Sequence, residues 1–223
     1  MISASAALER LRQGNRRFVD DMRNSGGRTS HIHDNGLAAT QEPFAIILGC
    51  SDSRVPAEIV FDQGLGDLFV IRVAGNIVAA SQIGSVEFAA ARFGTPLVVV
   101  LGHSSCGAVQ ATLEELLRSS EQQSRNLRSI VARIRPSVEA LLSTELKHDP
   151  AALVRHAVRS NVRVSASHLR HGSEILEGLI QRGRLLVVGA EYSLETGVVD
   201  FFEGVPDQAG KVSSPERPDP PRA

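Results

Sequence analysis

The residues best suited to chemistry are the chain's only two cysteines and one of its seven histidines, each placed just after an apolar run. The run at residues 45–48 leads through Gly49 into Cys50-Ser51-Asp52-Ser53-Arg54. The run at residues 97–101 leads through Gly102 into His103-Ser104-Ser105-Cys106-Gly107. Thiolates and imidazoles are preferred zinc ligands, and a catalytic zinc keeps three protein ligands and one open position. The two corners together indicate a single zinc ion bound by Cys50, His103 and Cys106.

Loops that bind phosphate are the main alternatives to a metal site in this part of the sequence. A phosphatase-like thiolate loop at Cys50 needs an arginine six positions later, where the chain has Pro56. A phosphate-binding loop at Gly64-Leu65-Gly66 lacks the glycine and lysine that should follow it. Taken singly, a buried cysteine is often a small apolar residue, and a histidine at a strand end is often a satisfied core group. The prediction of a metal site therefore depends on the fold bringing Cys50 close to His103 and Cys106.

Asp52 and Arg54 complete the first corner. Two residues apart in an extended chain, their side chains point the same way and can form an ion pair. Either this is a surface pair of little energetic weight, or Asp52 faces the metal while Arg54 holds it in place. His31 and His33 are a second candidate for metal binding, but in a polar, glycine-rich loop we expect exposed histidines instead.

Apolar strands alternate with helical segments along the chain, which predicts an α/β fold: a parallel-rich β-sheet flanked by helices, with an N-terminal helical arm. Strands are expected at 44–48, 68–73, 96–101 and 185–188, with an edge strand at 198–202. Helices are expected at 3–20, 56–61, 81–93, 107–117, 124–142 (interrupted at Pro136), 151–169 and 172–182. In such sheets ligands bind beyond the carboxyl ends of the strands, where both corners lie.

The chain divides by composition into a helical arm and loop (1–42), an α/β catalytic domain (43–205) and a tail expected to be disordered (206–223). Its 223 residues carry a formal net charge of -1 and only 4% aromatic residues, which gives nucleic acid neither a basic footprint nor stacking platforms. No apolar run is long enough to span a bilayer and no secretory signal is evident, so we expect a cytoplasmic protein without membrane partners.

The motifs Cys50-Ser51-Asp52-Ser53-Arg54 and His103-x2-Cys106-Gly107 resemble those of the β-class carbonic anhydrases, over roughly residues 40–204. The resemblance implies reversible hydration of carbon dioxide to bicarbonate and a proton by zinc-bound hydroxide, with one zinc per chain. Asp52 would accept a hydrogen bond from that hydroxide, with Arg54 as its partner, or would itself bind zinc in a closed form. The resemblance also implies a homodimer or homotetramer whose site lies near the subunit boundary.

Further positions are similar to those of the plant-like subgroup of that family. The resemblance assigns substrate contacts to Gln41, Phe69, Phe88 and Gly107, with Phe88 standing where the subgroup often has tyrosine. The other subgroup has an allosteric bicarbonate pocket built from Trp, Arg and Tyr. Arg72 and Tyr192 fit two of those positions, but Ile47 replaces the tryptophan, so we expect no strong inhibition by bicarbonate.

Two alternatives to carbon dioxide hydration remain open from the sequence. One is hydrolysis of carbonyl sulfide or carbon disulfide at the same site, which relatives of the family carry out. The other is a non-catalytic zinc protein in which Asp52 permanently fills the fourth position of the metal.

Overall fold

The computed structural model describes residues 2–23, 41–117 and 124–206. The predictions for His31 and His33, for the loop at 24–40 and for the tail at 207–223 lie outside these residues. None of the helices in the described segments is long and apolar enough to cross a membrane.

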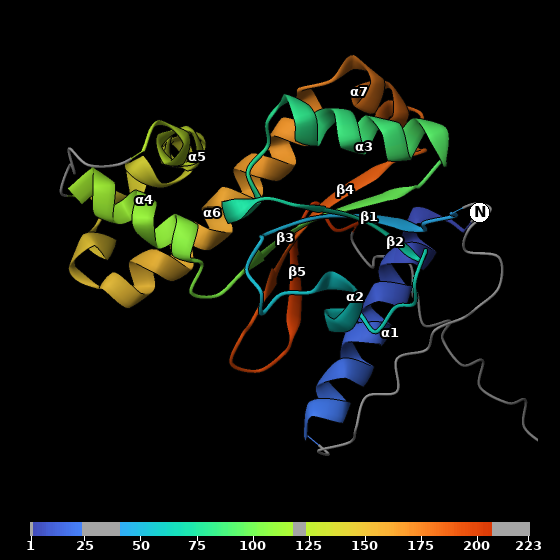
Figure 1. The fold of residues 1–223 in the computed structure, drawn as a ribbon, viewed down its shortest axis with the longest axis horizontal. Helices are drawn as coiled ribbons and strands as arrows, with labels where there is room; N and C mark the ends of the chain where they lie inside the picture. Colours follow the sequence, from blue (N-terminus) through green and yellow to red (C-terminus); the bar gives the residue numbers. More distant parts are fainter. Residues whose placement is uncertain (1, 24–40, 118–123, 207–223) are drawn as a thin grey trace, which may run out of the picture.

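A five-stranded mixed sheet forms the centre of the molecule (Figure 1). Its strands lie in the order β2-β1-β3-β4-β5. The strand bounds are β1 Ala45–Gly49, β2 Leu68–Arg72, β3 Leu97–His103, β4 Leu186–Tyr192 and β5 Val199–Glu203. The first four are parallel, and β5 pairs antiparallel with β4 at the edge. The predicted parallel-rich sheet and its edge strand are confirmed.

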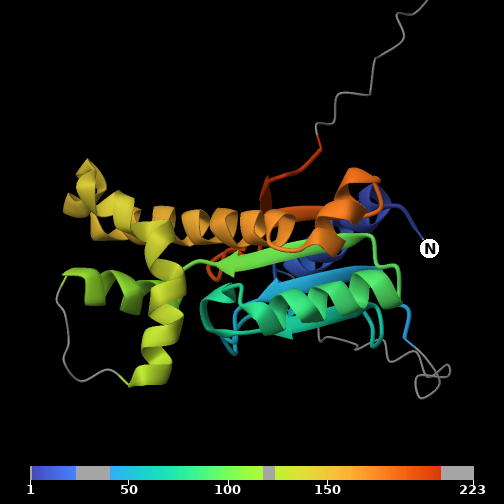
Figure 2. The ribbon, with the colours of Figure 1, turned by 90° about the horizontal axis from the view of Figure 1, so that it is seen from above.

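In the described segments, seven helices surround the sheet. They are α1 Ala4–Arg23, α2 Ala57–Val60, α3 Ala80–Arg92, α4 Gly107–Leu117, α5 Arg125–Val138, α6 Pro150–His171 and α7 Glu174–Gln181. Three 3-10 turns join them, at Ala74–Asn76, Glu139–Ser143 and Glu145–His148. Helices α1 and α2 pack on one face of the sheet, and α3, α7 and the C-terminal half of α6 pack on the other (Figures 1 and 2).

A third group of buried side chains lies beyond the carboxyl ends of the strands, among α4, α5 and the first half of α6 (Figure 2). Every residue of β1 and β3 is buried, because helices cover both faces of these two central strands. This explains why both read as unbroken apolar runs in the sequence. The buried cluster at the strand ends includes Cys50 and Cys106.

The expected arm at 3–20 is α1, and its apolar stripe packs on the sheet. Ala7, Leu8, Leu11 and Phe18 are all buried there. Asn15, also buried, donates hydrogen bonds from its amide to the carbonyls of Val60 and Gly197. Helix α1 is therefore fixed to the body of the same chain by polar as well as apolar contacts.

The ends of β4 and α5 differ most from the sequence prediction. Strand β4 continues to Tyr192 rather than ending at Val188, because pairing with β3 carries it through Gly189 and Ala190 despite their weak strand propensity. Helix α5 passes through Pro136 and ends at Val138, where a 3-10 turn begins. The proline removes one backbone donor, but it lies in the last turn, so the helix ends just after it rather than at it.

Candidate metal centre

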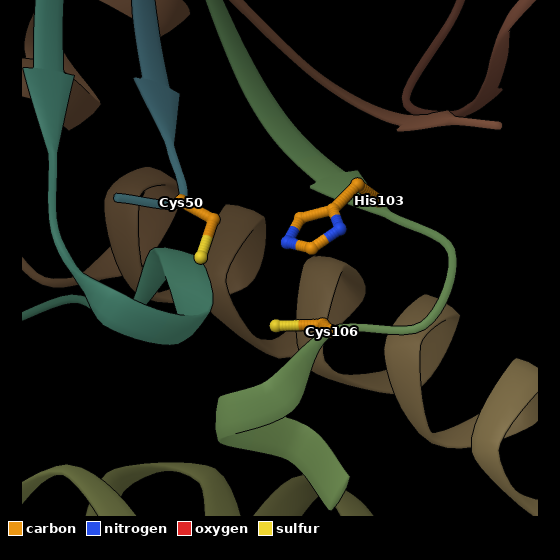
Figure 3. Close-up of side chains that lie close together, drawn as sticks. All are labelled: Cys50, His103 and Cys106. Carbon is orange, nitrogen blue, oxygen red and sulfur yellow. The ribbon is translucent and has the colours of Figure 1, made fainter. Parts of the chain in front are cut away.

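Cys50 directly follows β1, and its sulfur faces the cluster from the first corner (Figure 3). The backbone N–H of Gly75 donates to its Sγ at 3.3 Å. A hydrogen bond from the Cys106 thiol lowers the pKa of Cys50 to about 4 despite burial. This setting favours the thiolate form of Cys50, which is the form that binds a metal.

The second corner is a four-residue turn from the end of β3 to the start of α4. His103 is the last residue of β3 and is completely buried. Ser105 adopts a left-handed conformation with φ of 56°, which reverses the chain so that Cys106 turns back toward His103. Cys106 lies immediately before α4, and its pKa is raised because its proton is shared with Cys50 and because it is buried.

The three ligand atoms meet at one point: the two sulfurs and one imidazole nitrogen all lie within 4.8 Å of one another. His103 Nδ1 lies 2.9 Å from the carbonyl oxygen of Ser104, so Nδ1 carries the proton and donates it there. Nε2 is then a lone-pair acceptor, and within the described part of the chain this buried nitrogen has no hydrogen-bond partner. An orphaned imidazole nitrogen beside two thiol groups is the donor set that zinc selects. The residues fit a zinc ion.

Asp52 lies beside this cluster but is held by Arg54. The Arg54 guanidinium donates to both carboxylate oxygens, at 2.9 Å from Nε and 2.7 Å from the terminal nitrogen, and the Arg54 backbone N–H donates to Oδ1 at 2.9 Å. These hydrogen bonds keep the pKa of Asp52 well below its usual range. Asp52 Oδ2 lies 3.8 Å from His103 Nε2. Asp52 is therefore an ionised carboxylate beside the three candidate ligands, with both of its oxygens hydrogen-bonded to Arg54.

Arg72, at the end of β2, fixes the backbone of the same corner. Its Nε donates to the carbonyl oxygen of Cys50 at 3.1 Å, and a terminal nitrogen donates to that of Asp52 at 2.5 Å. The sequence reasoning assigned Arg72 only to a possible anion pocket and missed this role. The available signal was its place at the end of a parallel strand next to β1.

Comparison with known proteins identifies the family. A family model described as "Carbonic anhydrase" matches residues 45–199. "Carbonic anhydrase 2" of Mycobacterium tuberculosis is 41% identical over 197 residues, which cover 86% of this chain and 89% of that protein. "Carbonic anhydrase" of Mycolicibacterium smegmatis is 39% identical over 201 residues, covering 88% and 92%. The chain belongs to the β-class carbonic anhydrases.

Solved structures of this class have the same fold. The β-carbonic anhydrase CafA of Aspergillus fumigatus superposes with a TM-score of 0.67 at 26% identity, covering 91% of this chain and 92% of that one. The protein is therefore a carbonic anhydrase that hydrates carbon dioxide, and zinc is its metal. Among the described residues of this carbonic anhydrase, the cluster of Cys50, His103 and Cys106 is suited to bind that metal.

Gly107, the first residue of α4, lies next to Cys106. Among the described residues, apart from its chain neighbours and the backbone of its own helix, no atom comes within 4 Å of the place where a side chain at Gly107 would begin. The first N–H groups of a helix favour anions.

Gln41, Phe69 and Phe88 do not lie beside the metal cluster of their own chain, so their assignment as substrate contacts stays a prediction. Gln41 precedes β1, so it stands at the opposite end of that strand from Cys50. Phe69 is level with Ile46 in the sheet, four residues and about 13 Å before Cys50. Phe88, on α3, packs with its ring centroid 6.3 Å from that of Phe69 and is 53% exposed.

The three positions considered for an allosteric bicarbonate pocket are already engaged. Ile47 is fully buried in β1. The Tyr192 ring packs against Phe18 at 6.2 Å between centroids, and Arg72 holds the carbonyls of the first corner. The expectation of weak bicarbonate inhibition stays a prediction.

Proposed function

We propose that Cys50, His103 and Cys106 bind the catalytic zinc of this carbonic anhydrase, one ion per chain, and leave its fourth position to solvent. The observation that carries the proposal is the convergence of three buried ligand atoms within 4.8 Å, from two strand ends that are far apart in the sequence. Bound zinc supplies a Lewis acid that makes water nucleophilic toward carbon dioxide near neutral pH.

Asp52 and Arg54 are proposed as the catalytic pair. Because Arg54 engages both oxygens of Asp52, the carboxylate is held out of the fourth ligand position and stays ionised. In that position Asp52 accepts a hydrogen bond from the reacting solvent and orients it toward carbon dioxide. The same pairing argues against a non-catalytic zinc protein in which Asp52 closes the site.

Bicarbonate is the anion formed in this reaction, and it needs hydrogen-bond donors near the metal centre. The proposed donor is the Gly107 N–H, at the start of an eleven-residue helix whose dipole favours an anion. The absence of crowding at the Cβ position of Gly107 is consistent with this role.

Gln41, Phe69 and Phe88 are proposed to contact substrate at the site of a second copy of the chain, since they lie away from the metal cluster of their own chain. Phe88 is a large, exposed apolar side chain in a cluster with Phe69 and Phe93, and it is distant from its own metal corner. A solved relative from Sordaria macrospora, with a TM-score of 0.66 and 25% identity, is a tetrameric β-carbonic anhydrase. We propose a homodimer or homotetramer in the cytoplasm, where reducing conditions keep both cysteines available as ligands.

Zinc analysis and stopped-flow hydration of carbon dioxide on the same samples test the assignment. The wild-type protein is expected to hold one zinc per chain and to be active, and Cys106→Ser is expected to lose most of both. Ser53→Ala, an exposed change between Asp52 and Arg54, is the matched control and should keep both. A Cys106→Ser protein that retains full zinc and rate would overturn the ligand set. Hydrolysis of carbonyl sulfide faster than hydration of carbon dioxide would favour the alternative substrate.

A further inference from the structure

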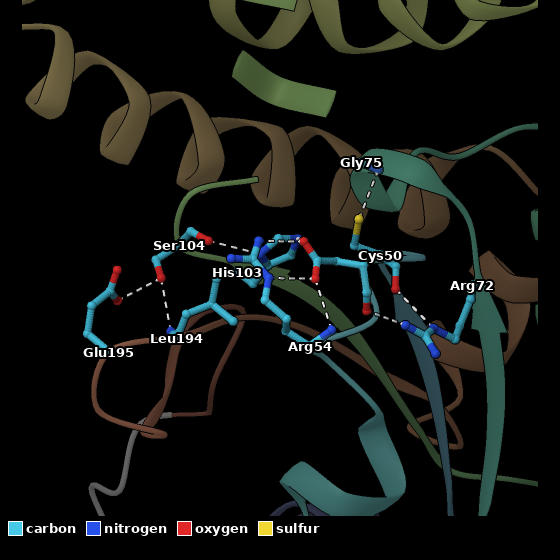
Figure 4. Close-up of polar contacts among 9 residues, drawn as sticks. Cys50, Arg54, Arg72, Gly75, His103, Ser104, Leu194 and Glu195 are labelled. Atoms are coloured by element: carbon cyan, nitrogen blue, oxygen red, sulfur yellow. Dashed lines mark hydrogen bonds and ion pairs between the residues drawn. The ribbon is translucent and has the colours of Figure 1, made fainter. Parts of the chain in front are cut away.

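The end of β4 and the turn that follows it hold Ser104, the residue after the candidate ligand His103, by three hydrogen bonds. Figure 4 draws those to Leu194 and Glu195. The Ser104 N–H donates to the carbonyl of Tyr192 at 2.9 Å. The Ser104 hydroxyl accepts from the Leu194 N–H at 3.0 Å and donates to Glu195 Oε2 at 2.8 Å. A segment about 90 positions away in the sequence thus fixes both the backbone and the side chain of Ser104.

Ser104 in turn determines the state of the His103 ring. Its carbonyl oxygen is the acceptor for Nδ1–H at 2.9 Å, so the direction of that carbonyl sets both the tautomer and the angle of the imidazole. This is the contact that leaves Nε2 free to face the two cysteines. Partners of this kind commonly orient a metal-binding histidine and raise its basicity.

The turn at this corner is not favourable by itself. Ser105 has φ of 56°, a left-handed conformation that costs energy for a residue with a side chain. A strained residue persists only where its surroundings hold it in place. The hydrogen bonds from the β4–β5 segment are such surroundings, because they fix the N–H and the side chain of Ser104, the residue immediately before Ser105.

Glu195 supplies the charged member of this arrangement. Its Oε2 accepts from the hydroxyls of both Ser104 and Ser193, at 2.8 and 3.0 Å. Hydrogen bonds from these hydroxyls lower the pKa of Glu195, so it is a carboxylate at neutral pH. Hydrogen bonds to a carboxylate are roughly twice as strong as neutral ones.

We propose that Glu195 is a positioning residue for the metal centre, which acts through the Ser104 hydroxyl to hold the Ser104 carbonyl against His103 Nδ1. Glu195 touches neither metal nor substrate in this role. The inference rests on the proposed function, since it takes His103 as a zinc ligand. It adds a surface residue on a distant turn to the group that determines how tightly the metal is held.

The rate of zinc loss from the loaded enzyme, measured with a chromophoric chelator, tests the proposal. Removing a residue that orients a metal ligand typically lowers metal affinity by roughly 10 to 100-fold, and Ser104→Ala is expected to speed zinc loss by about that factor. Glu195→Ala should give a smaller increase, and Glu195→Gln, which keeps an acceptor oxygen, a smaller one still. Ser104→Thr keeps the hydroxyl and should stay near wild type.

A double-variant comparison separates action through Ser104 from a general loosening of the turn. In the Ser104→Ala background, Glu195→Ala should leave the rate of zinc loss unchanged within about twofold. Additive effects of the two changes would overturn the proposal. Glu87→Gln is the matched control, because Glu87 accepts a hydrogen bond from Ser173 between α3 and α7, and it should not alter zinc loss.

Nuclear magnetic resonance of the His103 ring gives a readout that a purely structural role would not move. In the zinc-loaded wild type the Nδ1–H proton should exchange slowly with water, and in Glu195→Ala it should exchange at least several-fold faster at an unchanged melting temperature. Equal exchange in both proteins would contradict the positioning role. If instead the His103 signals of the wild type do not respond to zinc, the proposed ligand set fails, which distinguishes the two failures.

Discussion

Gly102 and Gly49 offer a direct test of how the two corners are packed. Each glycine immediately precedes a candidate ligand, Gly49 before Cys50 and Gly102 before His103. A Cβ at Gly102 would lie 2.5 Å from Val162 Cγ2 and 3.4 Å from Val158 Cγ1, both on α6. A Cβ at Gly49 would meet its nearest neighbours at 3.9 and 4.0 Å, which is ordinary contact.

The size of the effect follows from these distances. Carbon atoms in contact lie about 3.5 to 4.0 Å apart, so Gly102→Ala forces β3 and α6 about 1 to 1.5 Å further apart or distorts Val162. Overpacking of this kind costs about 1 to 3 kcal/mol of stability, which for a chain of this length lowers the melting temperature by roughly 2 to 12 °C. Because a displacement near 1 Å of a reacting group can cost about 100-fold in rate, hydration activity should fall as well.

Thermal unfolding and stopped-flow hydration of the zinc-loaded proteins measure both quantities. Gly49→Ala should melt at or slightly above the wild-type temperature, since alanine reduces the freedom of the unfolded chain. In a Val162→Ala background, Gly102→Ala should cost much less than it does alone, because the clashing methyl is gone. If Gly102→Ala melted as high as Gly49→Ala, the inferred close packing of α6 against β3 next to His103 would be refuted.

Three further outcomes are expected. Removing zinc with a chelator should lower the melting temperature, since zinc at one hundred times its dissociation constant stabilises by about 2.7 kcal/mol; added zinc should restore it and magnesium, which prefers oxygen ligands, should not. Burial raises the pKa of Glu191 despite its ion pair with Arg159, so its contribution to stability is complete below its unfolded pKa and is lost as pH rises through the folded one. Glu191→Gln should therefore gain stability relative to wild type between pH 5 and pH 8 in urea unfolding, and a gap that shrinks with rising pH would contradict this. Bicarbonate titration of the activity should show no steep cooperative loss, because Ile47 fills the position of the pocket tryptophan; a steep loss would show that the pocket works without it.

The strands and their corners could be predicted from the sequence because the signals are local. The central strands β1 and β3 are continuous apolar runs, and Cys50 and His103 stand at their ends. Parallel neighbours bring their carboxyl ends to one edge of the sheet, so the meeting of these residues followed from topology. The convergence of the candidate zinc ligands was foreseeable for the same reason.

The supporting contacts could not be predicted, because they depend on long-range packing. Ser104 and Glu195 are 91 positions apart, and nothing in the β4–β5 turn indicates which residue it will hold. Gly102 inside an apolar strand signals a close approach, but the sequence does not name α6 as the neighbour.

The place of Gln41 relative to Cys50 follows in part from the sequence, because the five-residue strand β1 stands between them. At about 3.3 Å per residue, the two ends of that strand lie roughly 13 Å apart.

Both cysteines of the chain face the same buried cluster, and the sequence contains no others. Every thiol that a sulfhydryl reagent can modify in this protein therefore belongs to the candidate metal centre. Because both thiols are buried, the rate at which a colorimetric thiol reagent reacts with the native protein reports the opening of this one centre, without a background from other cysteines.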